Sequence, residues 1–306
     1  MRKKKEKPKE IILDSPNRRP YAAKIRVLLQ NGYTLPVSDE VCLCIDDSQS
    51  IVRISPLEKN KPYFPTSSQK LDIFVEGYST AREAEQRGLK LSLSVLWAAI
   101  SRNFSLRLEY HTPLPCVVFD RTQENSQSFL IAMGANISVV LGIESVVKRI
   151  NEIFSDPTEV DQKLLVSMEI FASARLESTE RSRFIGLVSS IEPLITYQEY
   201  NNLELETLIN SFVSQAKKTL LPDNIRPSIM GRIKDLNKES IRQAIKRFVK
   251  EKLPENPEAI AIVDDAYNIR SKILHEGSFD ADLNSKSAEL EEIMRQIYAS
   301  ILGLNL

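Results

Sequence analysis

The segment Phe154-Ser155-Asp156-Pro157-Thr158-Glu159 separates two kinds of sequence pattern in this chain of 306 residues. Asp156 is a suitable helix N-cap and Pro157 a suitable first helical residue, so we expect a helix to begin here. Short β-branched runs precede the segment, and helical spacing of apolar residues follows it. The pattern predicts an α+β fold class: a mixed N-terminal domain over residues 11–153 and an all-α helical bundle over residues 157–306.

Four short β-branched or aromatic runs, separated by Pro, Asn, Asp and Ser, predict strands in the first domain. They are residues 41–45, 50–54, 71–75 and 116–119. One helix interrupts them, beginning at a capping box in which Thr80 accepts from the Glu83 N–H group and Glu83 reaches back. Its apolar residues lie on several sides, so we expect it to be buried against the sheet.

Helical periodicity continues after the boundary and predicts roughly five to seven helices. The apolar positions that carry it are Leu164, Leu165, Met168, Phe171, Phe184, Leu187, Val188, Ile191, Ile241, Ile245, Phe248, Leu290, Ile293, Ile297 and Ile301.

Composition describes an ordinary globular protein, with 42% hydrophobic and 27% charged residues. No run of eighteen apolar residues is present, so we expect no membrane span. Residues 1–10 form a basic arm that lacks the apolar run of a secretory signal, and we expect it to be disordered. Three cysteines without zinc spacing indicate a reducing, cytoplasmic location.

A formal net charge of zero argues against a sequence-specific DNA-binding protein, so any RNA site must be a local basic patch. Lys238, Arg242, Lys246 and Lys250 recur every four residues and are expected to share one helix face. These four side chains are the candidate RNA-binding residues, because they can follow a phosphate backbone. The alternative is that they form a solvated helix face, and the N-terminal arm offers a second, nonspecific polyanion contact.

The segment from Ala266 to Gly277 carries the candidate chemistry, because it places His275 five residues after Arg270. A histidine exchanges a proton near neutral pH, and a guanidinium holds two phosphate oxygens. We expect a helix from about Pro257 to end near His275, because Gly277 suits a left-handed C-terminal position. Residues five apart lie about 140° apart on a helix, so the pair would border a groove that a second copy could complete.

Other residues favour simple structural explanations. His111 is interpreted as a turn residue, and Trp97 as a core residue. Cys42 and Cys44 alternate along a strand and so cannot chelate one ion together. With two histidines and no carboxylate pair on a helix beside either, we expect no catalytic metal, and the lack of a glycine-rich phosphate loop argues against a nucleotide cofactor.

The segment around Arg270 and His275 resembles the Arg-x(4–6)-His element of the HEPN superfamily, specifically its Apea-like branch. Ser271 is the polar residue after the arginine, and Gly277 closely follows the histidine. Residues 183–192, an apolar run closing on Glu192, are similar to the family's earlier helix. The resemblance covers residues 157–306, while the N-terminal domain matches only through the turn at 79–84. Pro193 departs from the pattern, because a proline interrupts a helix and changes the placement of Glu192.

The resemblance implies a metal-independent, dimeric endoribonuclease of the kind found in toxin–antitoxin and phage-defence systems, with RNA as substrate and an antitoxin or sensor as partner. His275 would be the general acid or base, and Arg270 would stabilise the phosphate. Glu192 would orient one of them, with supporting roles for the polar residues Ser271, Tyr267 and Asn268. The alternative is a non-catalytic dimerisation or RNA-binding adaptor, in which Arg270 and Glu192 form a structural salt bridge.

Overall fold

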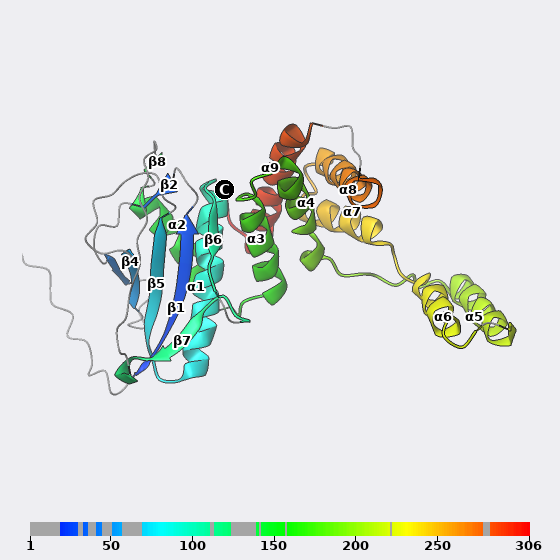
Figure 1. Ribbon diagram of the computed structural model, residues 1–306, viewed down its shortest axis with the longest axis horizontal. Helices are drawn as coiled ribbons and strands as arrows, with labels where there is room; N and C mark the ends of the chain where they lie inside the picture. The colour runs from blue at the N-terminus through cyan, green and yellow to red at the C-terminus, as the bar shows by residue number, and fades with distance from the viewer. Residues whose placement is uncertain are drawn as a thin grey trace, which may run out of the picture. The chain divides into compact units, whose positions relative to one another are not determined.

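The protein is seen in a computed structural model that describes residues 19–29, 33–35, 41–44, 51–56, 69–110, 113–123, 139–140, 142–156, 158–220, 222–277 and 282–306. The expectations for residues 1–10, His111 and Pro157 lie outside these ranges. The chain divides into two compact units, Met1–Leu176 and Glu177–Leu306. The predicted α+β class with a helical second part is confirmed (Figure 1).

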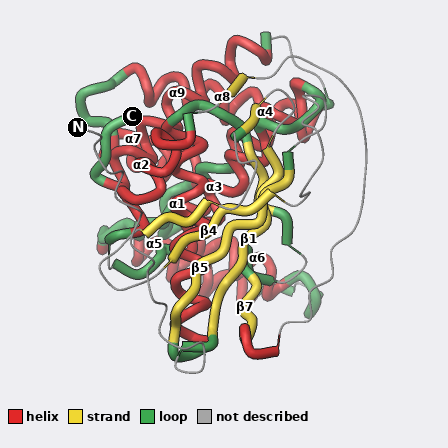
Figure 2. Tube along the Cα trace, turned by 90° about the vertical axis from the view of Figure 1, so that its left-hand side faces the viewer, coloured by secondary structure: helices red, strands yellow, loops and turns green. Residues whose placement is uncertain are grey.

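The first unit is built around an antiparallel sheet with strand order β3-β4-β5-β1-β6, in which β7 also pairs with β1. Its strands are β1 (Tyr21–Leu29), β3 (Val41–Cys44), β4 (Ile51–Pro56), β5 (Lys70–Tyr78), β6 (Leu106–Leu108) and β7 (Val117–Asp120). Figure 2 shows β4, β5 and β1 running side by side. Two further short strands, β2 (Tyr33–Thr34) and β8 (Val139–Val140), pair in parallel. The four predicted strands correspond to β3, β4, β5 and β7, whereas β1 at the centre of the sheet was not assigned.

One face of this sheet is covered by α1 (Ala81–Ser101). Thr80 caps the helix by accepting from the Glu83 N–H group at 3.1 Å, while the Glu83 carboxylate accepts from the N–H of Ser79 rather than that of Thr80. Every residue from Gly88 to Ser101 is buried, as the apolar pattern predicted. Gly88 lies so close to Ala23 of β1 that a Cβ atom built on it would meet the Ala23 Cβ at 2.8 Å.

The predicted boundary segment has a different structure from the one expected. Asp156 is not an N-cap: its carboxylate accepts from the backbone N–H and the hydroxyl of Thr158 and closes a turn. Lys90 of α1 donates to the Thr158 carbonyl at 2.8 Å and ties this turn to the helix. The next helix, α3 (Gln162–Ala174), begins later, with Asp161 as its N-cap.

Helices α2 (Ile143–Phe154) and α3 both pack against α1. The sequence placed α3 in the second domain, but the structure places it in the first unit, so the division falls after Leu176 rather than near residue 154. The reason is its apolar face, since Leu164, Leu165, Met168 and Phe171 are buried in this unit. Helix α2 was not predicted.

The second unit contains a packed group of four helices, α4 (Glu180–Ser189), α7 (Ile241–Lys252), α8 (Glu258–Glu276) and α9 (Leu283–Leu302). Each contributes apolar residues at helical spacing, such as Phe184, Ile245, Val263 and Ile297, all of which are at most 2% exposed. The described residues after 157 hold seven α-helices: these four, α3, and the two helices of the hairpin described next. Seven is within the predicted five to seven.

Two helices, α5 (Leu203–Lys218) and α6 (Arg226–Asp235), pack on each other and form a helical hairpin. The chain enters and leaves this hairpin through two segments that hydrogen bond in antiparallel fashion. The Tyr200 N–H donates to the Asn237 carbonyl at 2.8 Å, and the Glu239 N–H donates to the Gln198 carbonyl at 3.0 Å. Among the described helices of the two units, none is long and apolar enough to cross a membrane.

Candidate functional site

Helix α8 ends where the sequence predicted. It spans Glu258–Glu276, and Gly277 has the left-handed backbone conformation, with φ of 71°. A side chain is disfavoured at this φ, which explains why the helix stops at glycine. The expected start is also confirmed, because Pro257 is the N-cap residue. His275 therefore lies in the last turn.

Arg270 lies on the face of α8 that packs into the unit. The buried residues of the helix are Ala259, Val263, Ala266 and Ile273, and Arg270 falls between the last two at helical spacing. Its side chain is 22% exposed, and its Nη2 atom lies 3.3 Å from Oε1 of Glu192. The Nε atom is buried and has no hydrogen-bond partner in the described part of the chain. The guanidinium is thus part-buried and only partly satisfied.

Glu192 reaches Arg270 from a short 3-10 turn, Glu192–Leu194, and not from a long helix. The similarity to the family's earlier helix predicted an apolar helix through residue 192, but α4 ends at Ser189. Pro193 explains the break, because it lacks the N–H group that would continue the helical hydrogen bonds. Arg183, at the start of that segment, forms an ion pair with the buried Glu291 of α9.

Tyr267 belongs to the same cluster. Burial raises the pKa of its phenol, and the nearby Glu192 carboxylate raises it further, whereas Arg270 acts in the opposite direction. These effects require the three groups to be neighbours. Ser271 is half-buried and Asn268 is exposed on the same helix. The structure therefore brings together Arg270, Glu192 and Tyr267.

His275 is not part of that cluster within one copy of the chain. Its side chain is exposed, and among the described residues it has neither a hydrogen-bond nor an ion-pair partner. Its position, five residues after Arg270, turns it away from the buried face of α8 by about 140°. An exposed imidazole at a helix end is open to a ligand or to a second copy of the chain.

The candidate RNA-binding residues are organised differently from the prediction. Lys238 is not on the helix: it lies before the N-cap Ser240 of α7 and pairs with Asp235 at 3.5 Å. Arg242 and Lys246 both bind the carboxylate of Asp264 on α8.

Asp264 offsets part of the predicted positive charge. The hydrogen bond from Arg242 lowers the pKa of the Asp264 carboxyl to about 2, so the group stays ionised at neutral pH. Lys250 is exposed and has no ion pair in the described ranges. The sequence did not reveal Asp264, because its position opposite α7 depends on how α7 and α8 pack.

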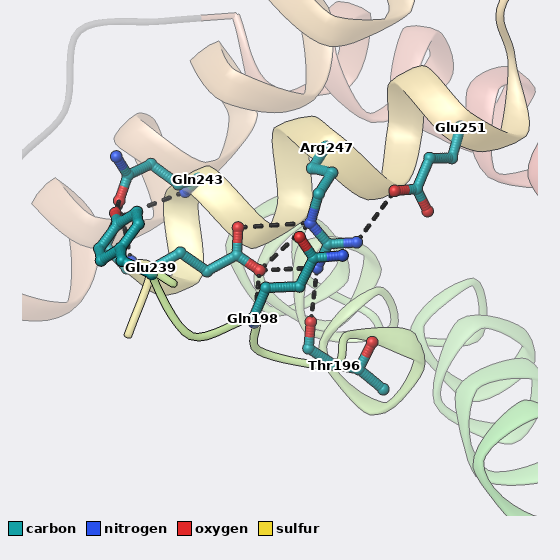
Figure 3. Close-up of polar contacts among 8 residues, drawn as sticks. Thr196, Gln198, Glu239, Gln243, Arg247 and Glu251 are labelled. Carbon is teal, nitrogen blue, oxygen red and sulfur yellow. Dashed lines mark hydrogen bonds and ion pairs between the residues drawn. The ribbon is translucent and has the colours of Figure 1, made fainter. Parts of the chain in front are cut away.

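A polar network centred on Arg247 of α7 was also not predicted from the sequence (Figure 3). Arg247 donates to Glu239 through Nη2 at 2.6 Å, to the Thr196 carbonyl at 2.6 Å and to Glu251 at 3.0 Å. Glu239, only 9% exposed, also accepts from the Gln198 N–H group at 2.8 Å. The hydrogen bond from Arg247 lowers the pKa of Glu239. The network joins α7 to both segments at the base of the α5–α6 hairpin.

Within the described ranges, no group of three or more His, Cys, Asp or Glu side chains is arranged to hold a metal ion. Comparisons with protein-family models, with curated proteins and with solved structures found no match.

Proposed function

We propose that this protein is a metal-independent endoribonuclease of HEPN type, acting in the cytoplasm as a toxin or in phage defence. The observation that carries the proposal is the pairing, on one helix, of a part-buried guanidinium with an exposed imidazole. Glu192 pairs with Arg270 at 3.3 Å, Tyr267 lies three residues before Arg270 on α8, and the buried Nε of Arg270 has no hydrogen-bond acceptor in the described part of the chain. The Arg270 side chain is 22% exposed, so a phosphate oxygen would approach the guanidinium from its accessible side.

In the proposed reaction, a ribose 2′-hydroxyl attacks the adjacent phosphorus. A general base takes the hydroxyl proton, the bond to the 5′-oxygen breaks, and a general acid gives that oxygen a proton. His275 is assigned to this proton transfer and Arg270 to the charge that grows on the phosphate oxygens. The products are a 2′,3′-cyclic phosphate and a 5′-hydroxyl end.

A homodimer completes the proposed site. Arg270 and His275 of one copy lie on different sides of α8, so one copy does not pair them; we propose that a twofold arrangement brings the imidazole of a second copy to the accessible side of this guanidinium. Ser271 and Asn268, on the accessible part of the same helix, are positioned to contact the substrate or the second copy. An antitoxin or sensor partner would control such an enzyme.

The test compares the wild-type protein with His275→Ala in RNA cleavage assays that contain EDTA. Loss of a general acid or base is expected to slow cleavage about 10²- to 10⁴-fold. The matched control is His111→Ala, which removes the other histidine of the chain and should cleave normally. Growth arrest and RNA integrity on expression give a second readout. Equal cleavage by wild type and His275→Ala would contradict the assignment.

A non-catalytic adaptor is the second candidate, and the Arg270–Glu192 ion pair favours it. A pair at 3.3 Å on the packed side of α8 can serve stability alone. In that case Arg270→Ala and Glu192→Gln lower the thermal stability by similar amounts, no RNA is cut under any condition, and His275→Ala leaves dimerisation and RNA binding unchanged.

A further inference from the structure

The face of the sheet turned away from α1 carries a group of charged side chains. Ala23 of β1 faces Gly88 of α1, so its neighbours Lys24 and Arg26 alternate to the opposite side. The strand register then assigns more residues to this side: Lys24 is opposite Phe74, and Phe74 is opposite Arg53. We call this surface the outer sheet face.

Six cations belong to the outer sheet face. They are Lys24, Arg26, Arg53, Lys70, Arg107 and Arg121. Lys70 and Arg107 both lie opposite Leu28, and Arg121 follows β7 and pairs with Glu76 at 3.0 Å. Only three carboxylates accompany them in the described ranges, those of Asp72, Glu76 and Glu109. Six positive and three negative charges leave an excess of three positive charges.

Two of these carboxylates lie beneath the cations, while the third, Glu109, is 21% exposed. Asp72 is 8% exposed and Glu76 is 6% exposed, while the six cationic side chains are 28–50% exposed. Arg26 holds Asp72 through Nε and Nη2, at 2.8 and 3.0 Å, and its Nη1 group has no described hydrogen-bond partner. A ligand approaching this face over Asp72 and Glu76 therefore meets guanidinium and ammonium groups before it meets a carboxylate.

Aromatic rings lie among these cations. Phe74 and Phe119 contact edge to face, with centroids 6.2 Å apart, and the guanidinium of Arg53 lies 4.7 Å from the Phe74 centroid. Phe119 is opposite Ala22, on the same side of the sheet. Both rings are half-buried. Aromatic rings and guanidinium planes are the surfaces on which unstacked bases stack.

We propose that the outer sheet face binds single-stranded RNA. Phosphates would contact the exposed cations, and bases would stack on Phe119 and on the Arg53 guanidinium over Phe74. Single strands fit this surface better than duplexes, because only unpaired bases offer their faces to the rings. This inference rests on the proposed nuclease function and assigns the binding of its single-stranded RNA substrate to the first unit. It can be tested without cleavage.

The experiment measures fluorescence anisotropy of a labelled oligouridylate with 2′-O-methyl groups, which cannot be cleaved by 2′-hydroxyl attack. The variant Lys24→Gln/Lys70→Gln/Arg107→Gln removes three exposed cations and keeps Arg26, Arg53 and Arg121, which neutralise the buried Asp72 and Glu76. Losing three phosphate contacts is expected to reduce the slope of log K against log salt by about 2. Affinity at low salt should fall at least about ten-fold.

The matched control removes three exposed lysines from the other unit, Lys217→Gln/Lys218→Gln/Lys234→Gln. It changes the net charge equally and should bind the oligonucleotide like wild type. Phe119→Leu tests stacking and should weaken binding at least about five-fold. Circular dichroism confirms that each variant is folded.

Several outcomes would overturn the proposal. Equal losses in the test and control variants would indicate a nonspecific charge effect. Equal affinity for a duplex of the same length, or a preference for vesicles with anionic lipids, would also reject it. Because the oligonucleotide cannot be cleaved, a failed cleavage assay and a failed binding assay remain separate results.

Discussion

Two helical glycines are expected to respond in opposite ways to the same substitution. Gly88 of α1 and Gly231 of α6 both lie inside helices. Alanine is favoured over glycine there by about 1 kcal/mol, because glycine loses more backbone entropy on folding. The surroundings of the two residues decide whether that gain is realised.

At Gly88 the added Cβ would lie 2.8 Å from the Ala23 Cβ, 2.8 Å from the Cys116 Sγ and 3.0 Å from the Cys116 Cβ. Carbon atoms prefer separations of about 3.5–4.0 Å, so the contact is severe. The Cβ atoms of Ala23 and Cys116 are fixed by the backbone of β1 and of the residue before β7, so side-chain rotation cannot move them away. Overpacking of about 3 kcal/mol, offset by about 1 kcal/mol of helix propensity, gives a net loss of about 2 kcal/mol for Gly88→Ala.

At Gly231 nothing lies within 4 Å of the added Cβ, so Gly231→Ala should gain up to about 1 kcal/mol. Denaturant titration separates the two effects. Trp97, the single tryptophan, is fully buried in α1 and reports the first unit by fluorescence, while circular dichroism reports helices of both units. If Gly88→Ala matches or exceeds the stability of wild type, the close approach of α1 to β1 is refuted.

Three further outcomes are expected. Arg247→Ala should lower the free energy of unfolding by about 2 kcal/mol, because Glu239 keeps its burial and loses its charged donor; an unchanged urea midpoint would contradict this. Asp264→Asn should be less stable than wild type above about pH 4, and the difference should shrink as pH falls toward about 2, the pKa at which Arg242 holds the Asp264 carboxyl. Burial raises the pKa of the Cys116 thiol to about 11, so with the other cysteines replaced by serine it should react with iodoacetamide at pH 8 only after denaturation.

Local signals explain which parts of the fold could be predicted. The start of α1 and the end of α8 follow from residues that act within a few positions, namely Thr80 with Glu83 and Gly277. The central strand β1 also carries a readable signal: Ala23, Ile25, Val27 and Leu29 alternate with half-buried residues, at the period of a strand with one buried face. The first helix after the boundary was placed too early, because Asp156 has equally good uses as a cap and as a turn.

The candidate site was predicted only in part, because it depends on a contact between residues far apart in the sequence. Arg270 and His275 are visible as neighbours in sequence, but the partner of Arg270 is Glu192, 78 positions earlier. The resemblance named Glu192, while Pro193 left open whether it reaches the arginine. Glu192 does reach Arg270 from the 3-10 turn, whereas His275 lies outside that contact because it is turned about 140° away on α8.

Charge patterns show most clearly what cannot be predicted from a single segment of the sequence. Arg242 and Lys246 form an evident basic stripe in the sequence, yet Asp264 on another helix neutralises much of it. Lys24, Arg26 and Arg53 form no motif, but strand register gathers them on one face with their carboxylates buried beneath. A helix stripe is judged from one segment, whereas the charge that a ligand meets depends on every neighbouring segment. The proposed RNA contact is for this reason assigned to the sheet and not to the helix whose sequence first suggested it.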